Sequence, residues 1–311
     1  MLTLLSGVAA RLYWTARYIE RVEDTVRLVS AYHHLIMDIP KGSEPGWDVL
    51  IRILDAEPDF HSRFRAANEQ NVLRYLLADA DVHCGIPYAV RAARENVRTT
   101  RDVLPEEAWE YVNELYLYCK EHAERSVGRR NRHAFLQGVL GRCQRMNGLI
   151  NTTLSRDHAA GFLKIGQLIE RSDMATRVLD VGVVDIVERE GAFAAIDAIL
   201  WGAQLQALSA QVAYRRQIGP IVERAPVIGF VFKERTHPRS VAFCLKGMRQ
   251  ELAILRNNDE SMRLADRARR RLSRFDPESM SPAQIHAFID KFQVLLNDIS
   301  ESISRTWFLS E

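Results

Sequence analysis

The sequence predicts an all-α protein, a pseudo-symmetric helical bundle built from two duplicated halves. Apolar residues recur with helical spacing over long segments, which proline and glycine separate. The segment Tyr18–Leu28, YIERVEDTVRL, largely returns at Leu168–Val178 as LIERSDMATRV, after a shift of 150 residues. Shorter matches follow in the same order at shifts of up to 155 residues. We therefore expect two homologous halves, 1–155 and 156–311, which form either two bundles or one merged core.

The first half is predicted to contain six helices. Proline and glycine after Met37 end the first of them, and Pro58 stops or bends the second. Pro105, followed by Glu106 and Glu107, is typical of a helix start, because proline fits the first turn and acidic side chains interact favourably with the helix dipole there. The expected helices span residues 4–37, 47–54, 68–78, 88–103, 105–127 and 132–153.

The second half repeats this order. We expect a loop around Pro220 and Pro226 that includes the short apolar run VIGFVF. Ser281, Pro282 and Gln284 predict a helix start with a capping serine, a first-turn proline and a capping-box glutamine. The expected helices span residues 157–182, 193–216, 238–257, 260–275 and 282–307.

The two matching segments retain charged as well as apolar residues. Glu20-Arg21 corresponds to Glu170-Arg171, and the acidic Glu23 corresponds to Asp173. At about 100° per residue the charges of the first segment share one helix face, opposite an apolar arc. One interpretation is a solvated ladder of ion pairs, each worth roughly 0.2 to 0.5 kcal/mol. The other is a pair of Glu/Arg clusters that face inward or into a cleft, and the recurrence of charge type and order supports it.

Composition excludes several classes of partner. The 311 residues carry 42 basic and 40 acidic side chains, so a net charge of +2 gives no reason to expect nucleic acid or an anionic membrane as partner. Four cysteines without a CxxC pair fit reduced thiols in a cytosol. The apolar start of the chain lacks a preceding basic segment, and no apolar run approaches the length of a membrane span. We expect a cytoplasmic protein.

Familiar catalytic and cofactor motifs do not explain the chain. A di-iron bundle requires two Glu-x-x-His spacings, which the sequence does not have, and HExxH is missing too. GxxxxGK[ST], GxGxxG and GxSxG do not occur either. The sequence therefore predicts no metal and no cofactor, and it identifies no catalytic residue.

Basic residues gather in three further places. Arg125–His133 and Arg263–Arg274 are interpreted first as solvated surfaces, with a phosphate site or an acidic partner as the alternative. Arg239 and Ser240 stand at a predicted helix start. Free N–H groups there can hold a carboxylate or phosphate, although ordinary capping explains the same residues equally well.

Four stretches together resemble the bacterial alpha-E family, which is predicted to be all-helical and is named for a Glu-Arg motif. They are RLYWTARYIERVEDTVRL, ARENVRTTRDVLPEEAWEYVN, LIERSDMATRVLD and HPRSVAFCL, and the resemblance covers nearly the whole chain. Its implications are contextual, because the family has no well-established reaction. Members tend to be encoded beside, or fused to, a circularly permuted ATP-grasp protein that looks like an amide ligase. A transglutaminase-like peptidase often accompanies them, and a proteasome-like peptidase sometimes does.

The resemblance and the repeated charges lead to one leading hypothesis and two alternatives. The leading one is a helical partner of an ATP-grasp-type ligase with a polar cleft, where arginines bind carboxylate or phosphate and Glu20 or Glu170 orients them or binds an amine. In one alternative the chain is itself an enzyme with either glutamate as acid or base, which flanking arginines disfavour by lowering the pKa. In the other, the clusters of a scaffold are purely architectural. The candidate ligand-binding residues are Arg17, Glu20, Arg21, Arg27, Glu170, Arg171, Arg177, Arg239 and Ser240.

Overall fold

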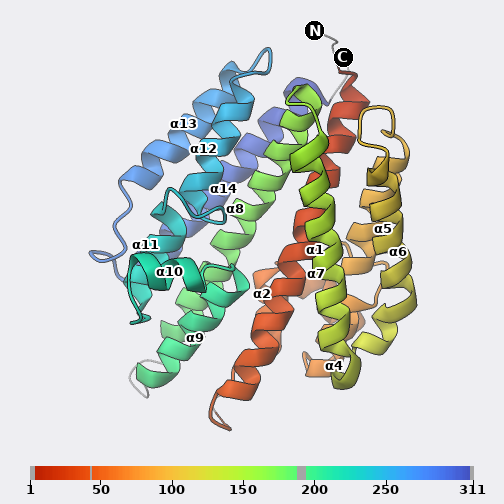
Figure 1. The fold of residues 1–311 in the computed structure, drawn as a ribbon. Helices are drawn as coiled ribbons and strands as arrows, with labels where there is room; N and C mark the ends of the chain where they lie inside the picture. The colour runs from red at the N-terminus through yellow and green to blue at the C-terminus, as the bar shows by residue number, and fades with distance from the viewer. Residues whose placement is uncertain (1–3, 43, 188–193, 309–311) are drawn as a thin grey trace.

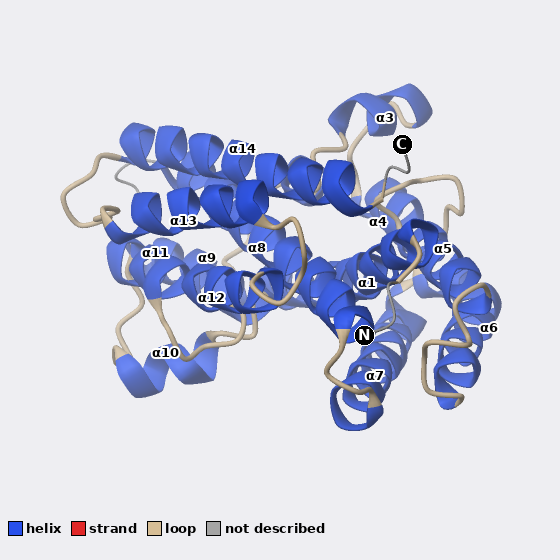
Figure 2. Cartoon of the chain, turned by 90° about the horizontal axis from the view of Figure 1, so that it is seen from above, coloured by secondary structure: helices blue, strands red, loops and turns tan. Residues whose placement is uncertain are grey.

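Two long helices, α1 (Ser6–Asp38) and α8 (His158–Val187), run through the middle of the molecule and pack along each other. The computed structural model describes residues 4–42, 44–187 and 194–308, and every regular element in these ranges is a helix. Figure 1 and Figure 2 show α5 and α6 on one side of the central pair and α12 and α13 on the other. The all-α prediction is confirmed.

The other helices are short connecting elements or members of the two flanking groups. They are α2 (Asp48–Ile53), α3 (Glu57–Arg63), α4 (Glu69–Leu77), α5 (Ile86–Arg98), α6 (Glu107–Ser126), α7 (Arg129–Thr153), α9 (Ala194–Ala207), α10 (Gln211–Gln217), α11 (Arg224–Lys233), α12 (Val241–Leu252), α13 (Asp259–Ser273) and α14 (Pro282–Trp307).

The helices contact one another in two parallel series. Helix α1 packs against α5 and α7, and α6 joins those two; α8 packs against α12 and α14, and α13 joins those two. Contacts also cross between the series, since α9 packs on α1 and α2 packs on α8. This order is what two related halves would give, although the duplication and the division after residue 155 stay predictions. Apolar side chains from both halves belong to one connected buried cluster.

The central helices approach each other closely where Gly166 of α8 faces Tyr13 of α1. A Cβ atom added at Gly166 would lie 2.2 Å from the Tyr13 carbonyl oxygen, well inside van der Waals contact. Only glycine fits here without a shift of one backbone. The short separation brings the facing side chains of α1 and α8 within direct ion-pairing distance further along the helices.

Most predicted helices are present, with three differences. Pro58 begins α3 rather than ending a helix, because it occupies the first turn, where a missing N–H has no cost. The same holds for Pro226 in α11, so the run VIGFVF is a buried helix and not part of a loop. The expected helix 193–216 is two helices, since Ser209, with φ of 52°, turns the chain between α9 and α10. The capping box of Ser281 and Gln284 is confirmed.

None of the helices in the described ranges is both long and apolar enough to cross a membrane. The central helices explain why: α1 and α8 exceed the length of a bilayer span, but each carries charged residues near its middle. These residues form the site described next.

Candidate functional site

The charged face of α1 is buried against α8. Glu20 has 0% of its surface exposed, and Glu23 and Asp24 are nearly as inaccessible. Val22 and Val26 on the other side of the helix are fully buried as well. Helix α1 is therefore enclosed all round, so its carboxylates face inward and do not form a solvated ladder. Carboxylates in such an environment need cationic partners.

The partners come from the opposite helix in a reciprocal way. Glu20 of α1 accepts two hydrogen bonds from Arg171 of α8, at 2.7 and 2.8 Å. Glu170 of α8 accepts one from Nε of Arg21 on α1, at 2.5 Å. The Glu-Arg pair of each helix thus forms ion pairs with the Glu-Arg pair of the other helix. This brings together four of the residues that the sequence singled out.

A second arginine, Arg239, also contacts Glu20 and shields it from solvent. We call Glu20, Glu23, Asp24, Arg171 and Arg239 the Arg239 cluster. The guanidinium of Arg239 lies 3.1 Å from Glu20 and 2.6 Å from Glu23, and it also donates to Asp24. The arginine is only 7% exposed, so its guanidinium is buried among these carboxylates. Three carboxylates and one inserted guanidinium form a packed, charge-assisted network.

Local structure explains how Arg239 reaches α1. Ser240 is the N-cap of α12 and accepts a hydrogen bond from the Phe243 N–H at 3.1 Å, while its hydroxyl donates to the Glu234 carbonyl. These two bonds fix the loop before α12. The first of them satisfies the helix start in the ordinary capping manner, and Arg239 contacts carboxylates of the chain itself.

Burial and ion pairing oppose each other in this cluster. Burial alone would raise the pKa of Glu20, but Arg239 and Arg171 outweigh it and lower that pKa below its usual range. For Asp24, burial raises the pKa more than the charge of Arg239 lowers it, and the nearby charge of Glu20 raises it further. The pKa of Asp24 is therefore about 8. One Asp24 oxygen, Oδ2, has no hydrogen-bond partner in the described residues. Glu20 is therefore ionised at neutral pH, whereas burial favours the protonated form of Asp24.

On the other side, Glu170 is held by two arginines of α1. Its second oxygen accepts from Nε of Arg17 at 2.6 Å, in addition to the bond from Arg21. Arg17 itself is fixed by Ser300 of α14 at 3.2 Å and by stacking on the Trp14 ring. Burial would raise the pKa of Glu170, yet the two guanidiniums lower it to about 2. A carboxylate this acidic is a poor general base at neutral pH.

A cavity of about 370 Å³ lies beside Glu170, and we call it the Glu170 pocket. It opens between α8, α1, the segment around α3 and α4, and the loop before α5. Four carboxylates and two guanidiniums are among its lining groups. The lining residues are Arg21, Leu54, Asp55, Ala56, Asp59, Tyr75, His83, Cys84, Glu170, Asp173, Met174 and Arg177.

Asp173 is a partly buried carboxylate of the Glu170 pocket. It is 19% exposed and pairs with Arg177 at 2.9 Å. Burial raises its pKa, against the effect of Arg177. The neighbouring Asp59 accepts from Tyr75 at 2.8 Å and from Arg63 at 3.0 Å. The pocket therefore combines carboxylates and guanidiniums that ion pairs within the chain hold in place.

Each of the six candidate arginines is paired with a carboxylate of the chain. Arg27 pairs with Glu23 at 2.8 Å and donates to Ser209, and the other five pair as described above. Sequence reasoning missed Asp59, Tyr75 and Cys84, because they come from short helices and loops outside the matching Glu-Arg segments. For Asp173 there was one signal in the sequence, because this residue corresponds to Glu23 in the repeated segment.

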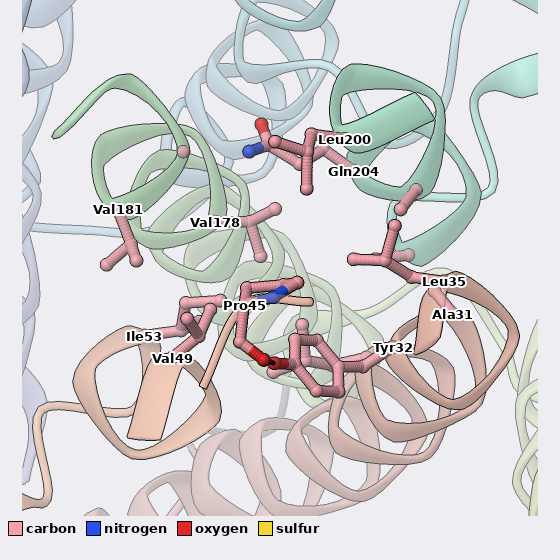
Figure 3. A pocket seen from close by; sticks show the side chains of 14 residues that line it. Ala31, Tyr32, Leu35, Pro45, Val49, Ile53, Val178, Val181, Leu200 and Gln204 are labelled. Carbon is pink, nitrogen blue, oxygen red and sulfur yellow. Dashed lines mark hydrogen bonds between the residues drawn. The ribbon is translucent and has the colours of Figure 1, made fainter. Parts of the chain in front are cut away.

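Three other features lie apart from this site in the described residues. Figure 3 shows an apolar cavity of about 60 Å³, where Leu35, Val178 and Leu200 point toward one another from α1, α8 and α9. Among the basic stretches, Arg132 is buried and pairs with Glu69 at 2.8 Å, so it is structural. His286 pairs with Asp180 at 2.6 Å and lies 3.7 Å from Asp290. These three groups could approach a metal ion together, but an exposed ion pair accounts for them.

A family model described as a predicted alpha-helical domain with a conserved ER motif matches residues 4–308. The chain belongs to the Alpha-E family. Two Glu-Arg pairs of this Alpha-E protein, Glu20-Arg21 and Glu170-Arg171, are those that meet at the centre of the fold. No curated protein and no solved structure gives a significant match.

Proposed function

We propose that this Alpha-E protein is the helical partner of an ATP-grasp-type amide ligase and supplies the Glu170 pocket to an amino-acid or peptide substrate. The partnership rests on the resemblance described above. A transglutaminase-like or proteasome-like peptidase of the same system is the further partner that this resemblance implies. The chain would act by holding a substrate group, and the ligase would carry out the bond formation.

The Glu170 pocket is the observation that carries the proposal. Its volume of about 370 Å³ is sufficient for part of an amino acid or peptide. In the described residues Arg21 pairs with Glu170 through Nε, so its terminal N–H groups can bind a substrate carboxylate or phosphate. Asp173 and Asp59 on the same wall suit an amine. A substrate of amide ligation carries both kinds of group.

The other two hypotheses fit the geometry less well. An independent enzyme would need a carboxylate with a pKa near 7, whereas the pKa values of Glu20 and Glu170 are lowered. A purely architectural role describes the Arg239 cluster, in which every guanidinium is enclosed. It does not explain an open polar cavity at the matching position of α8.

The first experiment is affinity capture of the tagged full-length chain from its own cells at moderate salt, followed by mass spectrometry. We expect an ATP-grasp-type protein in stoichiometric amount. Capture without any such protein, repeated after crosslinking in the cells, would refute the partnership.

The second experiment assays the reconstituted pair. ADP release by the captured ligase is measured with an amino-acid mixture, alone and with this chain. We expect the chain to increase turnover and Asp173→Asn to remove most of the increase. Asp266→Asn is the matched control, because Asp266 also pairs with arginine and is 25% exposed, but it lies on α13. Equal effects of the two variants would contradict a role for the pocket.

A further inference from the structure

The Arg239 cluster and the Glu170 pocket are built from corresponding positions. Arg239 stands two residues before the start of α12, which packs on α8, and Cys84 stands two residues before the start of α5, which packs on α1. Both helices begin after an extended N-cap residue, Ser240 or Gly85. The place that an arginine occupies on one side thus carries a cysteine on the other.

The groups that surround these two positions correspond as well. Glu20 and Glu23, which receive Arg239, match Glu170 and Asp173 of the pocket at a shift of 150 residues. The matches of Asp24, Arg27 and Arg171 also line the pocket; they are Met174, Arg177 and Arg21. The pocket therefore keeps most of the residues that surround Arg239. Arg17 supplies the second guanidinium to Glu170, but Cys84 stands where Arg239 would approach Asp173.

We infer that the Glu170 pocket binds the guanidinium group of an external ligand, in the position that Arg239 fills on the other side. The inference deepens the proposed function, since it names the substrate class of that site: an arginine residue or a small arginine derivative. Asp173 takes the role of Glu23, which lies 2.6 Å from Arg239. Asp59 adds a carboxylate on the outer wall.

Shape and charge favour a guanidinium over other groups. A cysteine side chain is several atoms shorter than arginine, and the space before α5 is correspondingly open. The planar guanidinium presents five N–H donors, which suits carboxylates that converge from several directions. Glu170 already has two arginine partners, whereas in the described residues the Asp173 carboxylate pairs with one arginine, Arg177, at 2.9 Å. A ligand cation would complete the environment of Asp173 as Arg239 completes that of Glu23.

The test is calorimetric titration of the full-length chain with L-argininamide. L-citrullinamide is the matched ligand, because it replaces the guanidinium by a neutral urea of nearly the same shape. We expect saturable binding of argininamide and at least tenfold weaker binding of citrullinamide. Equal affinity for the two compounds, or no saturable heat with argininamide, would overturn the inference.

Variants of the pocket sharpen the test. Cys84→Arg should fill the pocket from within and abolish argininamide binding, while Cys84→Ser should retain it. Asp173→Asn should weaken binding at least tenfold, and the control Asp266→Asn should leave it unchanged. A Cys84→Arg chain that unfolds leaves the Asp173 result to decide. An Asp173→Asn variant with unchanged affinity contradicts the inference.

The inference about the ligand class and the proposed partnership with a ligase can be refuted independently of each other. Binding of argininamide by a chain that captures no ATP-grasp-type protein supports the inference and contradicts the proposed partnership. Capture of the ligase by a chain that does not bind argininamide contradicts the inference alone.

Discussion

Replacing Glu170 by glutamine tests how strongly the reciprocal ion pairs stabilise the fold. The Glu170 carboxyl has a pKa of about 2 in the folded chain, against an ordinary value of 4.5. Each tenfold change in proton affinity corresponds to about 1.36 kcal/mol, so ionised Glu170 contributes about 3 kcal/mol at pH 7. With only 4% of the residue exposed, solvent screening removes little of this. Glu170→Gln should lower the free energy of unfolding by about that amount.

The pH dependence gives the prediction its sharper form. Because the folded pKa is depressed, the contribution is complete above about pH 4.5 and is lost as the pH falls through 2. At pH 3.5 the difference between wild type and Glu170→Gln should shrink to about 2 kcal/mol. The measurement is urea unfolding at both pH values.

The matched control is Glu114→Gln. Glu114 also pairs with two arginines, Arg142 and Arg145, but its side chain is 44% exposed. Its replacement should cost less than about 1 kcal/mol at either pH. A Glu170→Gln variant that loses no more than the control, or loses the same amount at both pH values, would refute the reasoning.

Two further predictions concern the same helix pair. Because the pKa of Asp24 is raised to about 8, its contribution to wild-type stability should fall as the pH rises from about 4 to 8. Asp24→Asn should make the free energy of unfolding depend less on pH in this range. An unchanged pH dependence would contradict the raised pKa of Asp24. Gly166→Ala, whose Cβ would lie 2.2 Å from the Tyr13 carbonyl oxygen, should lose about 1 to 3 kcal/mol. Gly141→Ala, whose Cβ would have nothing within 4 Å, should raise the free energy of unfolding by up to about 1 kcal/mol. Equal effects of Gly166→Ala and Gly141→Ala would contradict the close approach of α8 to α1 at Gly166.

The sequence allowed much of the fold and part of the site to be predicted, because both depend on local patterns. Long periodic segments and the Ser281 capping box predicted helices correctly. The Glu-Arg repeats indicated Glu20 and Glu170, since charge type and order recurred. These signals lie within single helices, where spacing alone defines a face.

The remaining features depend on contacts that spacing does not encode. Arg239 meets Glu20 across more than two hundred residues, and only the packing of α12 on α8 brings them together. Helix α11 escaped prediction because its run VIGFVF is buried all round and lacks amphipathic periodicity. The Glu170 pocket is lined by residues from several separate segments, and an empty volume has no sequence motif.

The reciprocal pairing of α1 and α8 has a consequence for how such a chain could be divided. Arg21 contacts Glu170 and Arg171 contacts Glu20, so the Glu-Arg pair of each helix is neutralised by the pair of the other helix. This is the isologous contact pattern of a two-fold homodimer, here within a single polypeptide. A fragment of residues 1–155 would bury Glu20 and Arg21 without their partners. Such a half-length protein would require a second copy, or the fragment 156–311, to become electrically neutral and fold.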